Sequence, residues 1–435
     1  MLWLAPRGVL LLIAAAAAAF ALATVAPAWV AAVVPLVLVV ALVAADAWAL
    51  RAPVEVERLA PPRLALARRD AFRYAVRNRA RDARFVALVE APADRLAIDV
   101  EEVHALVPAR AAVELHIGVL PRERGKTALR SFSLRLRTPF GLVERRRTVA
   151  AAVPLRVMPD LSALDRSGDP VARAKLIEAG LRRLRRRGAG GEFATLREYG
   201  PDDEFRSIDW KASARRGRTM VAQYEVERSQ QIVVALDAGR LMTARLGDRR
   251  KLDYAVSAAL AIAAIARLAA DRVGVLAFAG RVLARVAPGA GAAHAARLTD
   301  VLSDLEPHLE EADYERAFIA LEREVKRRSL IVLFTDLFDP VASSAVLAAT
   351  RILQPRHLVL VVLMNDAAIE TALARVPGGV EDAYRAAVAV TLADERTRAL
   401  AALRERGILV VDVPAADLTI ALLDAYVDVK SRGLL

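Results

Sequence analysis

The segment QIVVALD, residues 231–237, decides the fold of the C-terminal half of this sequence. Its residues are apolar without alternation, which is typical of a strand buried on both faces of a parallel sheet. Similar runs follow at VGVLAFAG (273–280), RVLARVAP (281–288), SLIVLFTD (329–336), HLVLVVLM (357–364) and ILVVDVP (408–414). Helical periodicity separates most of them. We therefore expect residues 231–435 to form a doubly wound α/β domain whose parallel-dominated sheet is covered on both faces.

The region before this domain has a different pattern. Residues 53–160 contain short segments of alternating polarity, punctuated by proline and glycine: RFVALVE (84–90), AVELHIGVL (112–120), SFSLRLRT (131–138) and TVAAAVPLRVMP (148–159). Period-two alternation without an amphipathic helix predicts a small antiparallel β-sandwich. Residues 161–230 read as a basic helical connector that ends in the run LRRLRRRGAGG, followed by a dense polar segment.

The N-terminus is strongly apolar. Residues 8–26 carry no charge, and residues 28–50 carry one, Asp46. Because about 20 apolar residues span a bilayer, residues 1–52 predict a transmembrane helical hairpin. Arg7 and the arginine-rich stretch from Arg51 flank it, so both ends and the soluble body should face the cytoplasm, as in a multi-pass protein of a bacterial inner membrane. The alternative is that the first segment is a cleaved signal peptide and the second a stop-transfer helix.

The charge distribution and the amino-acid composition exclude some classes of function. The absence of cysteine excludes disulfides and thiolate chemistry. Residues 51–230 carry a net charge of +13, and the rest of the chain sums to −1, which gives the total of +12. A basic zone beside a membrane segment would be attracted to an anionic leaflet or to an acidic partner. The connector residues expected to make that contact are Arg182, Arg183, Arg185, Arg186 and Arg187. Nucleic acid is the competing ligand for such charge, but no nucleic-acid-binding motif accompanies it.

Two of the predicted strands end in an acidic residue, Asp237 and Asp336, the second preceded by Thr335. If the strands are neighbours, these groups meet at the carboxyl edge of the sheet, where open α/β sheets bind ligands. The set resembles the metal-ion-dependent adhesion site of von Willebrand factor A domains, which would imply Mg²⁺.

The resemblance is incomplete. Gly239, Leu241 and Ala312 stand where that family has oxygen ligands, so the metal site is degenerate. The other interpretation is that both aspartates cap the helices that follow them.

No motif of an enzyme is present: the sequence has no nucleophile elbow and no phosphate-binding loop, and its five histidines are scattered. We therefore expect no catalytic residues and no obligatory cofactor. The alternative from another class is a Mg²⁺-dependent ligand-binding or hydrolytic site at the strand ends.

The segment LREYGPDDEFRSIDWKASARRGRTMVAQYEVE, residues 196–227, is dense in arginine and carboxylate. Arginine forks pair bidentately with carboxylates, so the segment predicts a hub of charge-assisted hydrogen bonds, with Ile208 and Trp210 anchoring it on the α/β domain. It could brace the connector as an ordered lid, dock a partner, or hold a small ligand. The candidate residues are Arg197, Tyr199, Pro201, Asp203, Arg206, Asp209, Trp210 and Arg215.

This segment also resembles the hallmark of a bacterial family, domain of unknown function fifty-eight, which typically reads R-x-Y-x-P-G-D-x-x-R-x-I-D-W. Asp202 replaces the glycine here. The resemblance implies a von Willebrand factor A-like domain behind a membrane anchor. It also implies a non-catalytic adaptor that acts with a MoxR-type AAA+ ATPase in chaperone-like remodelling or activation of a client. The client and the oligomeric state do not follow from the resemblance.

Overall fold

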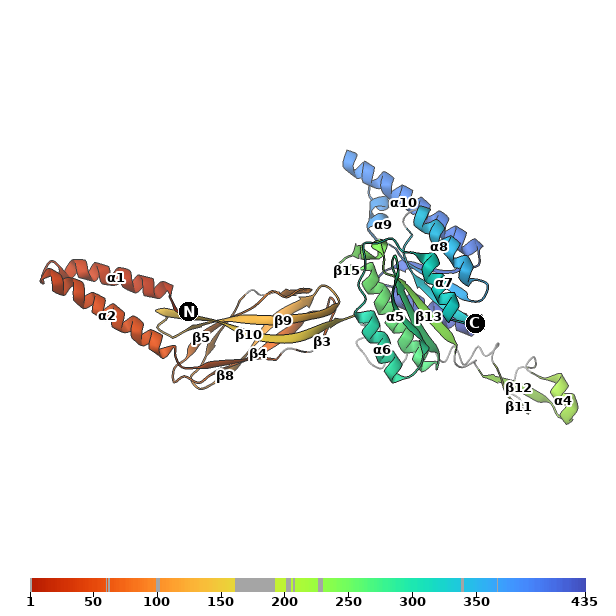
Figure 1. Cartoon of the computed structure of the whole chain (residues 1–435), viewed down its shortest axis with the longest axis horizontal. Helices are drawn as coiled ribbons and strands as arrows, with labels where there is room; N and C mark the ends of the chain where they lie inside the picture. Colours follow the sequence, from red (N-terminus) through yellow and green to blue (C-terminus); the bar gives the residue numbers. More distant parts are fainter. Residues whose placement is uncertain are drawn as a thin grey trace. The chain divides into compact units, whose positions relative to one another are not determined.

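The structure is a computed structural model, which describes residues 2–59, 61, 63–98, 102–160, 192–200, 205, 208–225, 230–337, 340–365 and 367–435. The chain has a mixed α/β fold and divides into two compact units, Met1–Met158 and Pro159–Leu435 (Figure 1).

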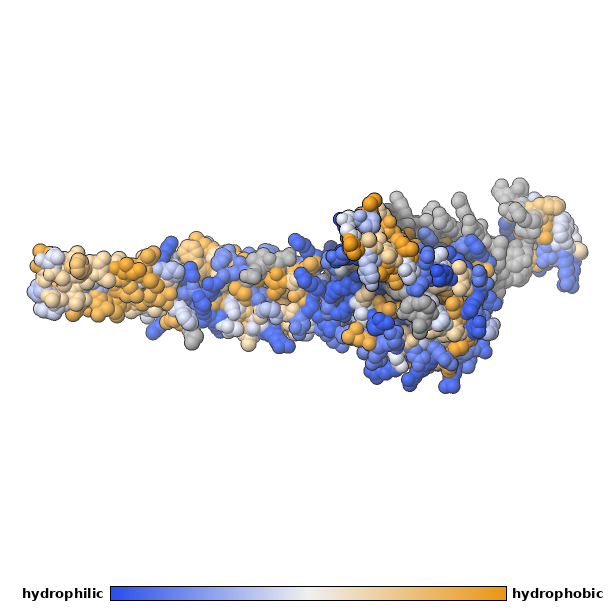
Figure 2. All heavy atoms as spheres, turned by 90° about the horizontal axis from the view of Figure 1, so that it is seen from above, coloured by the Kyte–Doolittle hydropathy of each residue, from blue (hydrophilic) through white to orange (hydrophobic). Residues whose placement is uncertain are grey.

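The first unit begins with two apolar helices, α1 (Pro6–Leu22) and α2 (Ala28–Ala49), whose surface is largely hydrophobic in Figure 2. Among the described helices only α2, with 22 residues, is long and apolar enough to cross a membrane, and a signal sequence has the same character. The predicted multi-pass hairpin is therefore not supported. With 17 residues, α1 rises only about 25 Å, short of a bilayer core of about 30 Å.

Two sheets of mostly antiparallel strands form the rest of the first unit. One has the order β1-β10-β9-β5-β7, with β3 pairing in parallel with β10, and the other has the order β2-β4-β8-β6. Alternating apolar residues of both sheets, such as Phe72 and Leu134, meet in a single core, as their period-two pattern predicts. The strands are β1 (Leu2–Leu4), β2 (Val54–Leu59), β3 (Arg63–Ala65), β4 (Asp70–Asn78), β5 (Arg84–Glu90), β6 (Leu96–Ile98), β7 (Val103–Val107), β8 (Ala112–Pro121), β9 (Gly125–Arg137) and β10 (Val143–Met158).

The loop between β9 and β10 fastens both apolar helices to the sandwich. Asp46, in the last turn of α2 and 4% exposed, accepts hydrogen bonds from the backbone N–H groups of Leu142 (2.9 Å) and Val143 (2.8 Å) and from the Thr138 hydroxyl. The N–H of Ala5, just before α1, donates to the Leu142 carbonyl at 2.9 Å. Gly8 packs on the same carbonyl, because a Cβ there would lie 2.4 Å from it. We call Asp46 and its three donors the Asp46 clamp.

The second unit contains a six-stranded sheet of order β17-β16-β13-β18-β19-β20. Four of its five neighbouring pairs are parallel, and the edge pair β16–β17 is antiparallel. Over the described chain as a whole, antiparallel pairs are the majority. The strands are β13 (Gln231–Asp237), β16 (Arg272–Phe278), β17 (Val282–Gly289), β18 (Ser329–Phe334), β19 (Leu358–Asn365) and β20 (Leu409–Pro414), and they occupy the apolar runs of the sequence.

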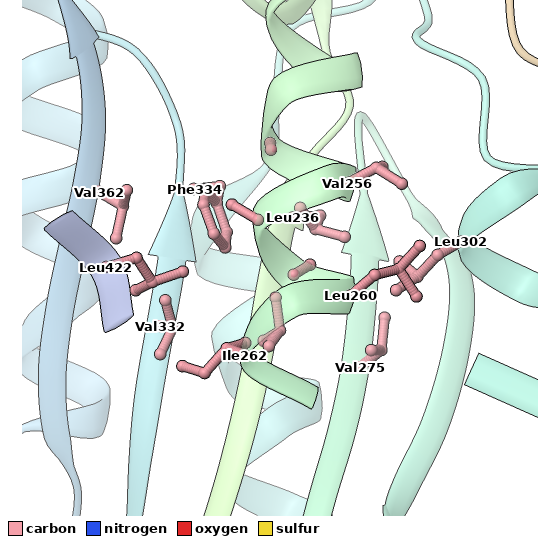
Figure 3. Packing of buried hydrophobic residues seen from close by; sticks show 14 of the residues in the cluster. Leu236, Val256, Leu260, Ile262, Val275, Leu302, Val332, Phe334, Val362 and Leu422 are labelled. Atoms are coloured by element: carbon pink, nitrogen blue, oxygen red, sulfur yellow. The ribbon is translucent and has the colours of Figure 1, made fainter. Parts of the chain in front are cut away.

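Helices cover both faces of this sheet. On one face, Val256 and Leu260 of α5, Leu302 of α6 and Leu422 of α11 pack on the strands around Leu236 (Figure 3). On the other face, residues of α7, α8 and α10 form a second core cluster. Each fully buried side chain of this size contributes about 1.5–3 kcal/mol. The helices are α5 (Lys251–Leu268), α6 (Ala292–Ser303), α7 (Tyr314–Glu324), α8 (Pro340–Leu353), α9 (Ala367–Ala374), α10 (Val380–Glu405) and α11 (Leu418–Ser431).

Candidate functional site

The carboxyl edge of the central sheet brings the predicted aspartates together. β13 ends at Asp237, and its parallel neighbour β18 is followed directly by Thr335 and Asp336. The Thr335 hydroxyl donates to Asp237 Oδ2 at 2.8 Å. All three side chains are at least 99% buried. Adjacent parallel strands therefore place these groups as the sequence predicts.

A loop closes over Asp237 and adds a tyrosine to it. The Arg240 N–H donates to the Glu310 carbonyl at 2.8 Å, and a Cβ at Gly239 would lie 2.9 Å from that same oxygen. Backbone thus fills the space where a larger side chain at residue 239 would lie. The loop leads into α7, whose first residue, Tyr314, places its hydroxyl 2.7 Å from Asp237 Oδ2 and 2.7 Å from Thr335 Oγ1.

Asp336 is engaged by two cationic side chains. Lys251, the first residue of α5 and 1% exposed, donates from Nζ to Asp336 Oδ2. α5 begins there because the Asp253 carboxylate accepts the Arg250 N–H at 2.9 Å, as in a helix cap. The guanidinium of Arg396, from α10, donates to Asp336 Oδ1 at 3.1 Å.

Arg396 also forms hydrogen bonds with groups at or near the ends of three strands. Besides Asp336 after β18, its guanidinium donates to the Met364 carbonyl of β19 at 3.0 Å and to Asp412 of β20 at 2.6 Å. We define the strand-end cluster as Asp237, Lys251, Tyr314, Thr335, Asp336, Arg396 and Asp412. Its members come from three strands or their ends, β13, β18 and β20, and from three helices, α5, α7 and α10.

Burial and pairing act in opposite directions on the titration of this cluster. Burial raises the pKa of Asp336, and the charges of Lys251 and Arg396 oppose that rise. Burial also raises the pKa of Asp237, against hydrogen bonds from Tyr314, the Gly239 N–H and Thr335. Burial and the adjacent Asp237 raise the pKa of Tyr314 well above its ordinary value, so its hydroxyl keeps its proton and remains a donor at neutral pH.

The arrangement favours a structural cluster over a metal site. Both aspartates already accept hydrogen bonds on both oxygens, and Lys251 supplies at Asp336 the positive charge that a divalent ion would bring. Among the described residues no group of three or more acidic, histidine or cysteine side chains is arranged to hold a metal.

We expect calorimetry of the full chain to detect no binding of Mg²⁺ or Mn²⁺ at millimolar concentrations, because the ion would have to displace a buried ammonium group. Binding that Asp336→Ala abolishes, and that Asp394→Ala on the exposed side of α10 leaves unchanged, would contradict this and restore the metal-dependent alternative.

The arginine-rich motif forms a separate small structure, in which β11 (Glu192–Glu198) pairs antiparallel with β12 (Met220–Glu225) and α4 (Trp210–Arg216) precedes β12. Asp209 begins α4 by accepting the Ala212 N–H at 2.9 Å, and Tyr199 donates its N–H to the Thr219 carbonyl at 2.9 Å. Arg197 lies on β11. Arg215 lies in the last turn of α4, where the helix dipole stabilises a positive charge.

The two residues expected to anchor this motif differ in exposure. Ile208 is 8% exposed and bridges to Val221, but Trp210 is 61% exposed and makes an edge-to-face contact with Phe205, itself 70% exposed, at 5.6 Å between ring centroids. The prediction that Trp210 is an anchor is therefore wrong: the start of α4 points the ring outward. Pro201, Asp203 and Arg206, and the connector residues Arg182, Arg183, Arg185, Arg186 and Arg187, lie outside the described residues.

The motif and most of the α/β unit match one family model. Residues 195–404 match the family described as "Protein of unknown function DUF58". An uncharacterized protein of Mycobacterium tuberculosis is 28% identical over 181 residues, which are 41% of this chain and 56% of that relative; a Mycobacterium bovis protein matches to the same extent. Uncharacterized protein YeaD of Bacillus subtilis is 41% identical over 44 residues, 10% of this chain and 11% of its own. The match thus spans little more than half the length of the mycobacterial relatives.

Two solved structures show weaker likeness. The conserved hypothetical protein BatB from Bacteroides thetaiotaomicron is 15% identical with a TM-score of 0.28, covering 46% of this chain and 99% of its own. A PapD-like domain of human CEP192 is 11% identical with a TM-score of 0.18, covering 24% of this chain and 84% of its own.

Proposed function

We propose that this chain, which carries a domain of the DUF58 family over residues 195–404, is a membrane-anchored interaction protein without catalysis of its own. The observation that carries the proposal is the pairing of Asp336 with Lys251 and Arg396 at the edge where an open α/β sheet would bind a ligand. A reactive carboxylate must reach substrate or water, whereas Asp237 is 1% exposed and Asp336 is fully buried. We infer a von Willebrand factor A-like domain whose metal-binding edge has become a permanent ion-pair cluster.

The anchor in this proposal is α2. Arg51 and the arginine-rich chain follow its C-terminal end, and positive residues flanking a membrane helix favour the cytoplasmic side. We therefore infer that the soluble body faces the cytoplasm of a bacterial cell. The bilayer is thus one partner of the protein.

The second partner is a MoxR-type AAA+ ATPase, as the family resemblance implies, with the chain acting as its adaptor in remodelling or activating a client. The surface we assign to this contact is the exposed pair Phe205 and Trp210. Exposed aromatic side chains of this kind are the residues that most often dominate protein–protein binding energy. Trp210 lies within the motif that defines the resemblance.

We expect Trp210→Ala to reduce co-purification of the ATPase with the tagged full-length chain by about tenfold or more, since loss of an aromatic hot spot costs about 2 kcal/mol. The measurement is quantitative mass spectrometry of complexes from detergent-solubilised membranes. Tyr384→Ala, which removes a 72% exposed aromatic from α10, is the matched control and should leave the yield unchanged. Asp209→Ala is less informative, because loss of a helix cap costs about 1 kcal/mol by itself.

Failure of the unmutated chain to retain any ATPase would refute the assignment of this partner. Retention that is equal in the wild type and in Trp210→Ala would keep the partner but reject the exposed aromatic pair as its binding surface.

A further inference from the structure

The outer face of the sheet that contains β5, β7 and β9 is hollowed at the end nearest the apolar helices. A cavity of about 530 Å³ lies there. Its lining comes from the first turn of α1, from those three strands and from the loop after β9, all within the first unit. We call it the juxtamembrane groove.

The floor of the groove is apolar where a solvent-facing sheet would be polar. Phe85 of β5 and Leu106 of β7 are directly opposite one another across the strand pair and are 45% and 52% exposed. Their inward neighbour Val86 is buried in the core, so the two exposed side chains are outward residues rather than displaced core residues. An apolar pair of this size in a concave surface favours an amphiphilic ligand.

The walls of the groove contain arginine side chains and the carboxylate of Glu102. Arg135 and Arg137 of β9 line it, paired respectively with Glu102 and with Glu144. Arg7, from the first turn of α1, donates to the Pro139 carbonyl at 3.2 Å. In the part of the chain that the structure describes, no carboxylate pairs with Arg7. One guanidinium is therefore left for an external anion.

The position of the groove identifies the source of that anion. Arg7 lies in the first turn of one apolar helix. The Asp46 clamp holds the end of the other helix to the same loop, residues 138–143. Exposed aromatic side chains surround these helix ends: Trp3 (52%), Trp48 (70%) and Phe140 (76%). Aromatic residues of this kind collect at the headgroup level of a membrane. The groove would then open at the height of the lipid phosphates.

We propose that the juxtamembrane groove binds one anionic phospholipid, with the phosphate against Arg7 and the glycerol and first methylenes over Phe85 and Leu106. This inference depends on the proposed anchoring by α2. In this proposal the two sheets of the first unit hold one lipid of the surrounding leaflet, and this contact would fix the orientation of the first unit at the membrane surface.

The test is native mass spectrometry of the full-length chain in detergent micelles with added phosphatidylglycerol or phosphatidylcholine. We expect one phosphatidylglycerol per chain to be retained about fivefold or more over phosphatidylcholine, because one arginine near an anionic headgroup contributes about 1 kcal/mol. Arg7→Gln should remove this preference, Arg7→Lys should retain part of it, and Phe85→Ser should weaken retention of both lipids.

The matched control is Arg122→Gln, which removes the same charge from the β8–β9 turn at the opposite end of the strands and should change nothing. Equal retention of the two lipids by the wild type, or an unchanged preference in Arg7→Gln, would overturn the proposal. Alkaline carbonate extraction of cell membranes tests the anchoring separately. A chain that stays in the pellet but shows no lipid preference disproves the groove alone, whereas release into the supernatant disproves the anchor.

Discussion

Lys251→Met should destabilise the α/β unit by about 3–5 kcal/mol, the cost of removing one partner from a buried ion pair. The substitution keeps most of the aliphatic volume of the side chain. Among the residues that the structure describes, it leaves only Arg396 paired with the fully buried Asp336. Hydrogen exchange of the β13 and β18 amides, measured on the full chain in detergent micelles, reports this directly. Their exchange should accelerate by about a hundredfold or more, since about 1.4 kcal/mol corresponds to a factor of ten.

The pH dependence of the stability loss in Lys251→Met distinguishes an unbalanced charge on Asp336 from lost side-chain packing. Burial already raises the pKa of Asp336, and loss of the Lys251 charge should raise it further. A carboxyl group whose pKa is higher in the folded state than in the unfolded state binds more protons when folded, so stability falls as pH rises through that window. The deficit of the variant should therefore be smaller at about pH 5 than at about pH 7.5.

Lys326→Met makes the same substitution at an exposed lysine after α7 and should shift stability by no more than about 0.5 kcal/mol. A deficit in Lys251→Met that is equal at both pH values would indicate lost packing instead of an uncompensated carboxylate. No deficit at all would mean that the cluster does not hold the sheet edge together. A metal or ligand at this edge would then not have to displace a stabilising ion pair.

The sequence predicted the sheet better than it predicted the site. Apolar runs such as residues 231–237 and 329–334 mark strands buried on both faces, and adjacency of two such strands brings Asp237 and Asp336 to one edge. The sequence did not predict that Lys251, Tyr314 and Arg396 contact these aspartates. Each is a polar residue of a helix, and helical periodicity does not indicate which turn of a helix lies at the sheet edge. Lys251 does carry a weak signal, since it begins a largely apolar helix directly after Arg249 and Arg250.

The N-terminal helices show a second limit of the sequence pattern. The predicted first segment runs to residue 26, but α1 ends at Leu22. There the Thr24 hydroxyl donates to the Ala21 carbonyl, and the chain turns before Pro27. A prediction from hydropathy alone includes these turn residues in the membrane-spanning segment. Likewise, the sequence indicates only a single charged residue near the end of an apolar helix at Asp46. The hydrogen bonds of this carboxylate could not be predicted, because its three donors lie more than 90 residues away in sequence.

Asp46→Ala should open the loop that joins the apolar helices to the two sheets of the first unit. The carboxylate satisfies two backbone N–H groups and one hydroxyl in a buried site, and hydrogen bonds to a charged group contribute about 1.5–3 kcal/mol. Loss of the carboxylate leaves the Leu142 and Val143 amides without an acceptor. Their hydrogen exchange in the full chain should accelerate roughly thirty- to a hundredfold.

Two further variants define what the Asp46 clamp does. Asp46→Asn keeps one carbonyl oxygen as an acceptor but loses the charge, so exchange at residues 142 and 143 should fall between the wild type and Asp46→Ala. Asp70→Ala, at the start of β4 and exposed, removes a carboxylate far from the loop along the strands and should leave both amides protected. If Asp46→Ala left these amides as protected as the wild type, the pairing of β1 with β10 and the Ala5–Leu142 hydrogen bond would be sufficient to hold the helices. The carboxylate would then be a tolerated charge at a helix end rather than the link between a membrane helix and the unit that follows it.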